Sequence, residues 1–126
     1  VEAENSILTN VSTNNNHGGY SGTGFVDSYG KAGDAVTMDF FVPETGDYKL
    51  SFVYSAAVDG TPKRELYINA YGYDSISFPA TSNWEEWNTS ETTVHLRAGI
   101  QRMVVYCGNA DDGYINFDSV HISKSA

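Results

Sequence analysis

The sequence predicts an all-β protein, an antiparallel β-sandwich of the jelly-roll type that forms a single domain over residues 1–126. Short runs rich in β-branched and aromatic residues recur along the chain, and helical periodicity is almost absent. Gly, Pro, Asn and Asp separate these runs at the spacing of hairpin turns. With 126 residues, the chain is long enough to bury a hydrophobic core without disulfides. These observations favour eight or nine short strands in two packed sheets.

The expected strands follow one another over the whole chain. They are placed at "EAEN", 24–28, 35–42, 47–55, 64–71, 73–78, 92–98, 101–108 and 114–123. In 47–55 every second residue from Tyr48 to Tyr54 is aromatic or leucine, which gives one clearly apolar face. Hairpin turns are expected at "PETGDY", "VDGTPK", "NAYGYD" and "RAGIQ", because each offers a Gly where positive φ would be favoured.

The charge balance excludes two classes of partner. Seven basic and 16 acidic residues give a formal net charge of −9. A nucleic-acid backbone needs clustered Lys and Arg, and an anionic membrane surface needs a basic patch, so neither partner is expected. An acidic excess suits solubility and also the binding of a hard cation such as Ca²⁺ through carboxylates.

Cys107 is the single cysteine, so no internal disulfide can form. It ends the apolar run "RMVVYC", where a buried structural thiol is expected. No stretch approaches 18 apolar residues, and no signal-peptide pattern is visible. The abrupt start at an expected strand and the polar end "SKSA" are typical of a module excised from a larger protein.

The sequence shows no constellation typical of an enzyme. A Ser/His/Asp order, the H-E-x-x-H motif and a Walker loop are all absent. His17, His95 and His121 are scattered over a loop and two expected strands. The segment "GGYSGTG" lacks the lysine and the following helix of a phosphate-binding loop. Catalysis is therefore not expected from this chain.

The opening "VEAEN" carries two carboxylates on one side of an extended strand, because Glu2 and Glu4 are two residues apart. Like charges side by side repel each other, so an ordinary strand gains nothing from them. From the residues alone three interpretations are open: a solvated strand edge, a catalytic carboxylate pair, or two ligands of a hard cation. The catalytic version is disfavoured because no opposed carboxylate across a cleft is evident.

Two tryptophans in the polar segment "TSNWEEWN" carry the clearest binding signal. Sugars present flat C–H faces that stack on aromatic rings, and their hydroxyls need a few planar polar partners. One of Trp84 and Trp87 is expected to fill the core. The other is expected to lie on a sugar-binding surface.

Six fragments together resemble a known family. They are "VEAEN", "GGYSGTGFVD", "GDAVTMDFFVPETGDYKLSFVYSA", "KRELYINAYG", "TSNWEEWNTSETTVHLRAGIQRMVVY" and "GYINFDSVHI". Their order and spacing resemble carbohydrate-binding modules of the family 6 and family 35 group, with family 35 the closer match, over nearly the whole chain. The resemblance implies a non-catalytic module of a secreted bacterial enzyme that degrades plant cell-wall polysaccharide. Its partners would be the polysaccharide and a covalently linked catalytic domain, and a monomer is expected.

The resemblance also implies a structural Ca²⁺. In the family, the E-x-E pair of the first strand and the Asp of the last strand meet on this cation, and they correspond here to Glu2, Glu4 and Asp118. Backbone carbonyls of "GGYSGTG" would be further ligands. A cation that joins the first strand to the last would couple its binding to folding. Some family 35 members use a second Ca²⁺ to bind a uronic acid.

For the sugar platform, the resemblance implies a tryptophan of the "TSNWEEWN" segment. Trp84 is favoured because it lies farther from the strand, and Trp87 is the alternative. Asn116 matches an asparagine that often hydrogen-bonds the sugar. Simple alternation would put Asn116 and Asp118 on the same strand face, which conflicts with their separate roles. A β-bulge, or an early turn at 113–114, would remove the conflict.

Three further residues are candidate sugar contacts. Arg64 matches an arginine that pairs with a uronate carboxylate in some family members, which suits its bidentate geometry, although a surface cation explains it equally well. Asn109 in the loop "GNADDG" would add a polar contact. Tyr29, which with Tyr20 flanks the Gly-rich segment, would add a second ring wall.

The ligand itself stays open among alternatives. Arg64 and the acidic loop favour a uronic acid held through Ca²⁺. A neutral mannan or a galactosyl-containing polysaccharide is the alternative, and a structural or adhesion β-sandwich without a sugar site is the rival from another class. An exposed Trp84 beside a cleft would favour sugar binding, whereas two tryptophans packed in the core would favour the rival.

Overall fold

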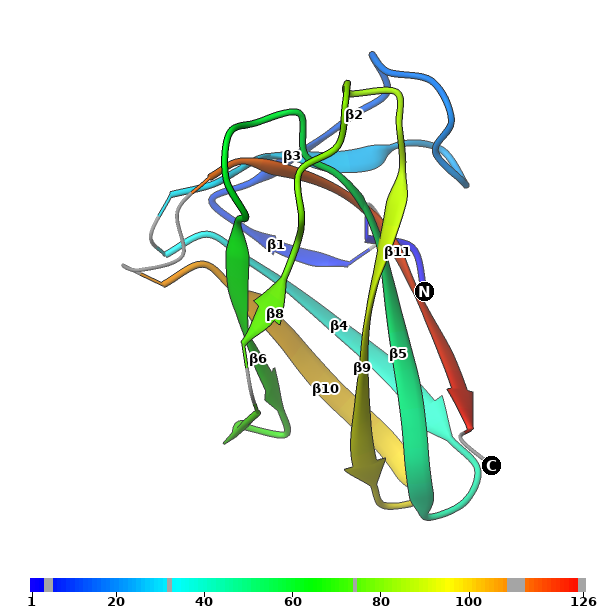
Figure 1. The fold of residues 1–126 in the computed structure, drawn as a ribbon. Coiled ribbons are helices and arrows are strands. Elements are labelled where there is room, and N and C mark those ends of the chain that lie inside the picture. Colours follow the sequence, from blue (N-terminus) through cyan, green and yellow to red (C-terminus); the bar gives the residue numbers. More distant parts are fainter. Residues whose placement is uncertain (4–5, 32, 74, 109–112, 125–126) are drawn as a thin grey trace.

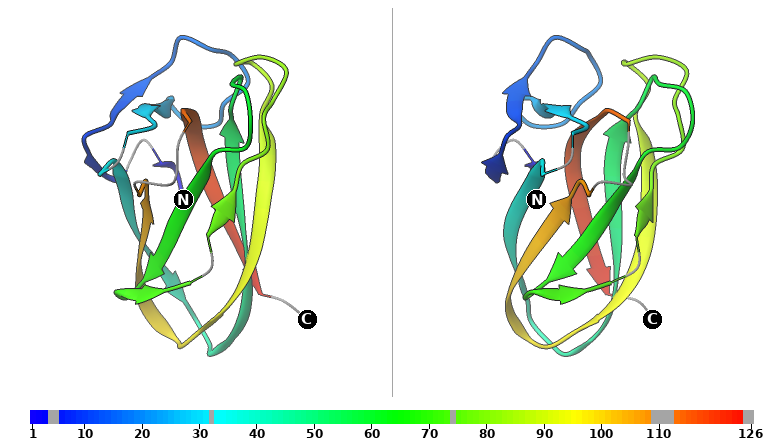
Figure 2. Two further views of the ribbon diagram at one scale, coloured as in Figure 1. Left: turned by 60° about the vertical axis from the view of Figure 1, so that its left-hand side comes forward. Right: turned by 90° about the vertical axis from the view of Figure 1, so that its left-hand side faces the viewer.

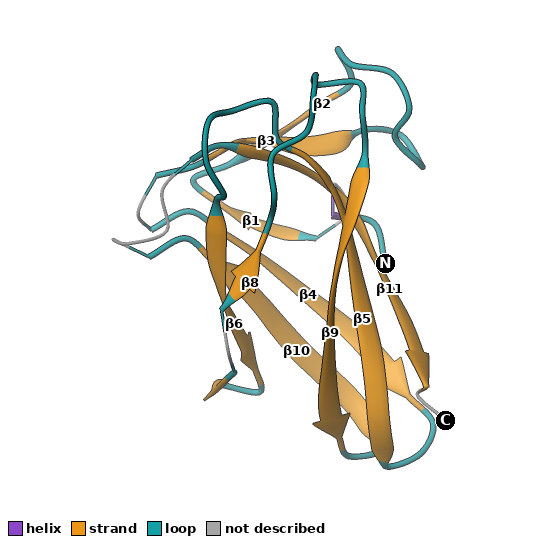
Figure 3. Ribbon diagram, viewed as in Figure 1, coloured by secondary structure: helices purple, strands orange, loops and turns teal. Residues whose placement is uncertain are grey.

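The computed structural model describes residues 1–3, 6–31, 33–73, 75–108 and 113–124, and strands dominate its regular structure (Figure 1). In chain order the strands are β1 (Ile7–Thr9), β2 (Ser12–Asn14), β3 (Phe25–Tyr29), β4 (Ala35–Val42), β5 (Gly46–Ser55), β6 (Lys63–Ile68), β7 (Tyr71–Gly72), β8 (Ile76–Ser77), β9 (Asn88–Leu96), β10 (Gly99–Tyr106) and β11 (Ile115–Lys124). Within the described residues, helical geometry is confined to a short turn at Ala3 (Figure 3). No helix in this part of the chain is long and apolar enough to cross a membrane.

The strands form two antiparallel sheets that pack face to face (Figure 2). Sheet A has the order β2-β3-β11-β5-β9. Sheet B has the order β1-β4-β10-β6-β7, and β8 pairs with β6 beside it. The predicted all-β jelly-roll sandwich is therefore confirmed.

The hydrophobic core lies between the two sheets. In β5 the alternate side chains Leu50, Phe52 and Tyr54 are buried, as the sequence pattern predicts. Met103 and Val105 of β10 are fully buried on the side of sheet B. Complete burial of an aliphatic or aromatic side chain contributes roughly 1.5–3 kcal/mol. The two apolar faces together therefore hold the sheets against each other.

Most predicted strands lie within a few residues of their expected bounds, and β4 has the predicted bounds 35–42. Cys107, directly after β10, is buried as predicted. The sequence does not predict β1 and β2, because three residues are too few to show an alternation. The predicted strands 64–71 and 73–78 are interrupted, since Asn69 and Ala70 have positive φ in a tight turn and only the short β7 and β8 pair with β6.

The predicted strand at "EAEN" is reduced to a short contact with the last strand. The Val1 ammonium group donates to Val120 O at 2.9 Å, and Val120 N–H donates to Val1 O at 2.9 Å. Glu2 then forms a single bridge with Ser119. Residues 4–5 lie outside the described residues. The start of the chain is therefore fixed against β11.

A β-bulge in β11 changes which of its residues face the core. The register with β5 shifts by one residue between Phe117 and Ser119, so that Asp118 is an extra residue in β11. The inner face therefore passes from Phe117 to Val120, and both are fully buried. Strict alternation, which puts Ser119 on the face of Phe117, is wrong for this strand because the extra residue shifts the pleat by one.

Candidate functional site

Loops from three parts of the sequence meet at one end of the sandwich, which is the upper end in Figure 1. We call this set of loops, residues 15–24, 56–62 and 78–87, the aromatic end. Thr81 N–H donates to Ala56 O at 2.8 Å, and Ala56 N–H donates to Thr81 Oγ1 at 3.1 Å. Ser55, at the end of β5, donates its hydroxyl to Asn83 O at 3.2 Å. These bonds fix the 78–87 segment to the end of sheet A.

An aromatic cluster separate from the main core covers the outer face of sheet A at this end. Phe25 of β3 lies at its centre and is fully buried, while its neighbour Val26 faces the core. The ring centroids of Trp87, Tyr20 and His17 lie 5.2, 5.6 and 6.1 Å from that of Phe25. Aromatic pairs of this kind contribute about 0.5–1.5 kcal/mol beyond their buried area. The cluster therefore packs the 15–24 loop against the 78–87 segment.

Trp87 anchors the 15–24 loop to the sandwich. Its indole N–H donates to Gly18 O at 2.7 Å, and its ring packs on Phe25. Gly19 has a φ of +97°, and a Cβ at that position would lie only 2.8 Å from Trp87 Cδ1. Both the backbone conformation and the close approach of the indole therefore require a glycine there.

Trp84 lies beside this cluster and is half-buried. Its ring centroid is 6.2 Å from that of His17, with the two planes inclined by 34°. His17 Nδ1 contacts the Glu85 carboxylate, and Glu85 N–H donates to Asn83 Oδ1 at 2.9 Å. The neighbours of Trp84 are thus held in place while part of its ring stays accessible. An ordered, partly exposed ring is what stacking on a sugar face requires.

The two predicted asparagine contacts have different outcomes. Asn116 pairs with Ser55 of β5, next to the aromatic end, and is only 8% exposed. Asp118 contacts Ser21 instead, so the bulge gives Asn116 and Asp118 different neighbours and removes the predicted conflict. Asn109 lies outside the described residues together with the rest of 109–112. The role of either asparagine in sugar binding stays a prediction.

Arg64 and Tyr29 are core residues, contrary to the expectation that they contact the sugar. Both have an exposed fraction of 0%. Arg64 donates to the carbonyl oxygens of Tyr29, Lys63 and Gly113 at 2.7, 2.7 and 2.9 Å, and its guanidinium carbon lies 4.5 Å from the centroid of the Tyr29 ring. Burial raises the pKa of the Tyr29 hydroxyl far above its ordinary value, and this hydroxyl donates to Val105 O. Neither side chain offers a surface to a ligand in this structure.

An acidic pair forms where the start of the chain meets β11. Ser21 Oγ lies 2.9 Å from Glu2 Oε2 and 3.0 Å from Asp118 Oδ2, and Ser21 N–H donates to Asp118 Oδ2 at 2.9 Å. Asp118 is 2% exposed, and its second oxygen, Oδ1, is buried and has no hydrogen-bond partner among the described residues. The fold therefore brings together the two predicted metal ligands that the structure describes, although they come from opposite ends of the sequence.

The surroundings of this acidic pair fit a hard cation. Burial raises the pKa of the Asp118 carboxyl above its ordinary value, the nearby charge of Glu2 adds to the rise, and the hydrogen bonds from Ser21 oppose it. The single hydroxyl proton of Ser21 cannot serve both carboxylates at once. A buried carboxylate oxygen without a donor, next to a second carboxylate, is chemistry that Ca²⁺ satisfies.

The set of ligands is incomplete in the described part of the chain. Among those residues no group of three or more His, Cys, Asp or Glu side chains is placed to hold a metal ion. Glu4, the third predicted ligand, lies outside them. The backbone carbonyls expected from "GGYSGTG" stay a prediction, and the contacts of this segment with the acidic pair are the N–H and hydroxyl of Ser21.

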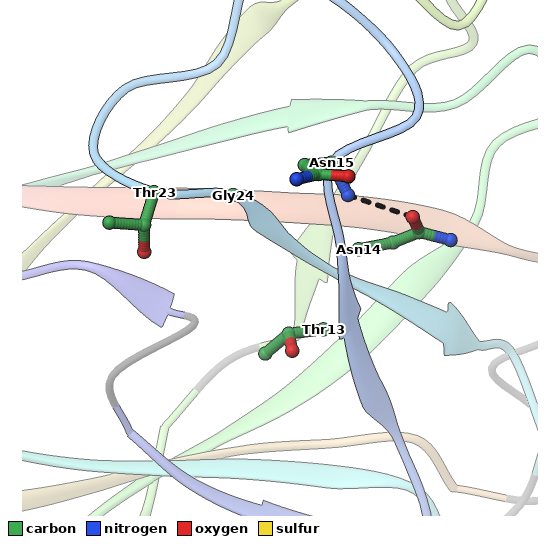
Figure 4. A pocket seen from close by; sticks show the side chains of 5 residues that line it. All are labelled: Thr13, Asn14, Asn15, Thr23 and Gly24. Carbon is green, nitrogen blue, oxygen red and sulfur yellow. Dashed lines mark hydrogen bonds between the residues drawn. The ribbon is translucent and has the colours of Figure 1, made fainter.

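A polar hollow of about 280 Å³ lies along β2 and the start of β3 (Figure 4). Thr13, Asn14, Asn15, Thr23 and Gly24 line it. Asn14 Oδ1 accepts a hydrogen bond from Asn15 N–H at 2.8 Å, and Asn14 Nδ2 donates to Asp27 at 2.8 Å. None of the described residues that line the hollow is aromatic, and the side chain of Asn14, one of its two asparagines, is already hydrogen-bonded. It is therefore less suited to a sugar face than the ring of Trp84.

The sequence does not single out three residues that shape this end of the molecule. His17 packs beside Trp84, Phe25 is the centre of the aromatic cluster, and Ser21 links the two carboxylates. The only sequence feature that could have indicated them is the spacing of His17, Tyr20 and Phe25 in "HGGYSGTGF". The partners of these residues are distant in sequence, and a local pattern does not reveal such contacts.

Known proteins match this chain over nearly its whole length. The family profile described as Carbohydrate binding module (family 35) matches residues 1–125. The isomaltosyltransferase of Sporosarcina globispora is 38% identical over 122 residues, which are 96% of this chain and 11% of that protein. The chain thus spans about one tenth of the length of such a relative.

Solved structures match the fold closely. The cycloisomaltooligosaccharide glucanotransferase of Paenibacillus sp., complexed with cycloisomaltoheptaose, has a TM-score of 0.93 and 37% identity over 95% of this chain and 17% of that chain. A Listeria monocytogenes protein in complex with α-D-glucose, β-D-glucose, magnesium and calcium has a TM-score of 0.93 and 41% identity over 98% of this chain and 12% of that chain. The profile match and these relatives show that the chain belongs to carbohydrate-binding module family 35, whose members are non-catalytic sugar-binding domains of larger carbohydrate-acting enzymes.

Proposed function

We propose that this module binds a neutral α-glucan oligosaccharide at the aromatic end and so holds a linked catalytic domain on its substrate. The observation that carries the proposal is the half-buried ring of Trp84, which packs beside His17 among the loops and outside the main core. Membership of family 35 supports a sugar as the ligand and a larger enzyme as the context. In this function the module positions the substrate and leaves the chemistry to the linked domain.

The proposed binding mode combines one ring with a few polar groups. The C–H face of a pyranose would stack on Trp84, and its hydroxyls would meet the exposed residues Ser82 and Asn83. Asn116, paired with Ser55 beneath the Asn83 segment, would contribute through its small exposed edge. Asn109 is retained as a proposed polar contact.

Two observations support a neutral glucan over a uronic acid. Arg64, the expected partner of a uronate carboxylate, has no exposed area, and its guanidinium donates hydrogen bonds to backbone carbonyls. The Sporosarcina globispora relative is named an isomaltosyltransferase, and the Paenibacillus structure contains cycloisomaltoheptaose, so both concern glucose-based ligands. Mannan and plant cell-wall uronates are therefore the competing ligands in the test below, and galactosyl-containing polysaccharides are a further alternative.

We also propose a structural Ca²⁺ held by Glu2 and Asp118, with Glu4 as the third carboxylate. The unpartnered Oδ1 of buried Asp118 supports it, as does the second carboxylate nearby. The Listeria monocytogenes structure, of which this chain matches 12%, also contains calcium and magnesium. Such an ion would join the start of the chain to β11, and it would add about 2.7 kcal/mol of stability at a concentration 100 times its Kd. In this proposal it has no direct contact with the sugar.

The proposed context is a secreted bacterial enzyme, because polymeric glucans are too large to enter a cell and are degraded outside it. The module is proposed to act as a monomer. The linked catalytic domain is its covalent partner in this proposal.

The test is isothermal titration calorimetry of the module with three probes, each with and without EDTA. The probes are isomaltoheptaose, mannohexaose and a glucuronic acid-containing xylo-oligosaccharide. We expect isomaltoheptaose to bind, and we expect Trp84→Ala to weaken that binding about tenfold or more, since a buried ring contributes of the order of 1.5–3 kcal/mol. Phe41→Ala is the matched control, because Phe41 is an exposed ring (64%) on the other sheet.

The outcomes separate the alternatives. Binding of the glucuronic acid probe alone, abolished by EDTA, would contradict the neutral-glucan proposal and favour the uronate version. Binding of mannohexaose alone would show that the ligand is a mannan and not a glucan. If none of the three probes binds, the assigned ligand classes are wrong, and unchanged binding by Trp84→Ala would remove Trp84 from the site.

A further inference from the structure

A second hollow with exposed aromatic rings lies at the opposite end of the sandwich from Trp84. It is formed by the β6–β7 turn and the β9–β10 turn, which both lie at the lower end in Figures 1 and 2. Its volume is about 340 Å³, and Tyr71, Tyr73, His95, Arg97 and Ile100 are among its lining residues. We call it the tyrosine hollow. Neither its position nor its residues overlap the aromatic end.

Tyr71 is the most exposed large hydrophobic side chain among the described residues, at 70%. Its ring centroid lies 5.5 Å from that of Tyr73, with the planes at 72°, so the two rings form two walls of one corner. The Tyr73 hydroxyl lies 3.5 Å from His95 O on β9. Ile100 adds a further apolar surface and is 69% exposed. Rings left open to water in this way mark a place where a ligand with an apolar face gains by covering them.

The turn that carries Tyr71 is held in one conformation. Asn69 and Ala70 have φ of +54° and +67°, a strained pair for residues other than glycine. Asn69 Nδ2 donates to Gln101 Oε1 at 2.9 Å, and Arg102 N–H donates to Asn69 Oδ1 at 2.9 Å. Gln101 is 3% exposed, and its Nε2 donates to Arg97 O at 2.6 Å. The ring of Tyr71 is thus presented by a turn that is fixed on β10, which lowers the entropic cost of binding.

Polar groups that suit sugar hydroxyls stand at the rim of the hollow. Arg97 is exposed, and within the described residues it forms no ion pair. His95 is held by Asp47, whose Oδ1 lies 2.9 Å from His95 Nδ1. A guanidinium with five donors and an oriented imidazole are partners that vicinal hydroxyls accept. An exposed ring beside a few planar polar groups is the combination that also characterises the Trp84 surface.

We propose that the tyrosine hollow is a second carbohydrate-binding site. A neutral pyranose would place its C–H face on Tyr71, its edge against Tyr73 and Ile100, and its hydroxyls on Arg97 and His95. The site is independent of the aromatic end, and only the choice of an α-glucan as its ligand rests on the function proposed above. Two sites at opposite ends would let one module engage two segments of a polysaccharide, which raises its avidity without new contacts.

The test is two-dimensional amide NMR of the whole module titrated with isomaltoheptaose. Four variants are compared with the wild type: Tyr71→Ala, Tyr71→Phe, Trp84→Ala and the Tyr71→Ala/Trp84→Ala double variant. Phe41→Ala is the control, because Phe41 is an equally exposed ring that pairs with Ile100 across β4 and β10 but does not line the hollow. Because Tyr71 is mostly exposed, its replacement should leave the Tm of the module unchanged.

We expect saturable shifts at residues 69–73 and 95–98 that persist in Trp84→Ala. The Kd obtained from these shifts should rise about tenfold in Tyr71→Ala and by the same factor in the double variant, and it should be unchanged in Tyr71→Phe and Phe41→Ala. If Trp84→Ala abolishes every shift, or if the shifts around Tyr71 follow protein concentration and not sugar, the second site is wrong. If the wild type shows shifts around Tyr71 but none at the aromatic end, the proposed function is contradicted and the second site is supported, so the two failures are distinguishable.

Discussion

Arg64 and Asp118 are both charged side chains buried in this sandwich, but the protein satisfies their charges to different degrees. Arg64 lies among neutral acceptors: three carbonyl oxygens within 2.9 Å and the face of the Tyr29 ring. Asp118 lies next to a carboxylate of like charge, shares one serine with it, and has an oxygen without a donor in the described part of the chain. The first charge is stabilised by the fold itself, whereas the second is destabilised by it.

This difference distinguishes a buried charge that the fold itself satisfies from one that needs a bound cation. A buried cation surrounded by carbonyls and a π face needs nothing more, even where one atom such as Arg64 Nε lacks a hydrogen bond among the described residues. A buried anion beside another anion is costly unless a cation joins them. The two tryptophans are both half-buried, and they differ in that the N–H of Trp87 donates to Gly18 O, whereas the ring of Trp84 lies beside His17.

The largest effect is expected for Arg64→Met. The substitution removes the donors of three carbonyls and leaves them in the core, so the free energy of unfolding should fall by about 3–5 kcal/mol. The loss should be the same with and without Ca²⁺, as measured by urea unfolding. Arg102→Met is the control, since Arg102 is an exposed arginine paired with Asp39 at 2.8 and 3.0 Å, and its loss should change stability little. If the loss of stability in Arg64→Met depended on Ca²⁺, Arg64 would not be a purely structural charge.

A smaller effect on the free energy of unfolding is expected for Asp118→Asn, and its sign should differ between EDTA and Ca²⁺. In EDTA the variant should be as stable as the wild type or more stable, because it removes a buried charge beside Glu2. In Ca²⁺ the wild type should gain about 2–3 kcal/mol and the variant little, since a carboxylate ligand is lost. Thermal unfolding in both buffers measures the difference. A variant that keeps the full calcium gain would exclude Asp118 from the metal site.

The pH dependence should also change sign with calcium. The pKa of the Asp118 carboxyl is raised in the folded protein, so without metal the native state holds its proton longer. The free energy of unfolding should therefore fall as the pH rises from the ordinary value of 3.8 through the raised pKa. With Ca²⁺ it should rise over the same window, because the ion binds the ionised form.

The difference between wild type and Asp118→Asn isolates this contribution from that of the other acids. Unfolding at a series of pH values, with and without Ca²⁺, gives the two slopes. Identical slopes in both buffers would show that the Asp118 carboxylate does not bind the ion.

The smallest effect is expected for Glu2→Gln. Glu2 is only partly buried, and the Ser21 hydroxyl can still donate to an amide oxygen, so stability in EDTA should hardly change. The calcium gain should fall by about 1 kcal/mol, less than for Asp118→Asn, because a more solvated ligand contributes less. Glu44→Gln is the matched control, an exposed acid paired with Lys124 far from the site. An equal effect of both substitutions would point to general charge and not to a bound ion.

The local patterns were enough to predict the strands and the sandwich. The alternation in 47–55 predicted the buried face of β5, and the turn residues predicted where most strands end. The prediction of hairpins was wrong for three of the four turns, because "PETGDY", "VDGTPK" and "RAGIQ" connect strands of different sheets, and only "NAYGYD" joins paired strands, β6 and β7. Strict alternation predicted the wrong inward-facing residues in β11. The bulge depends on the pairing of β11 with β3 and β5, and the hydrophobic pattern of the segment does not reveal it. The burial of Arg64 could not be predicted for a related reason. The sequence around an arginine at the start of a strand is the same whether the side chain points to solvent or into the core.

The sequence by itself determined the all-β class and the acidic character, which depend on residue type and on spacing along the chain. That a first-strand Glu meets a last-strand Asp was implied by the resemblance to the family and not by spacing. Only the tertiary structure decided that Arg64 and Tyr29 are core residues, that Trp87 is anchored by Gly18 O, that Ser21 links the two carboxylates, and that Tyr71 stands open at the far end. The physical reason is that burial and hydrogen-bond partners are properties of packed neighbours, and in a sandwich those neighbours are distant in sequence.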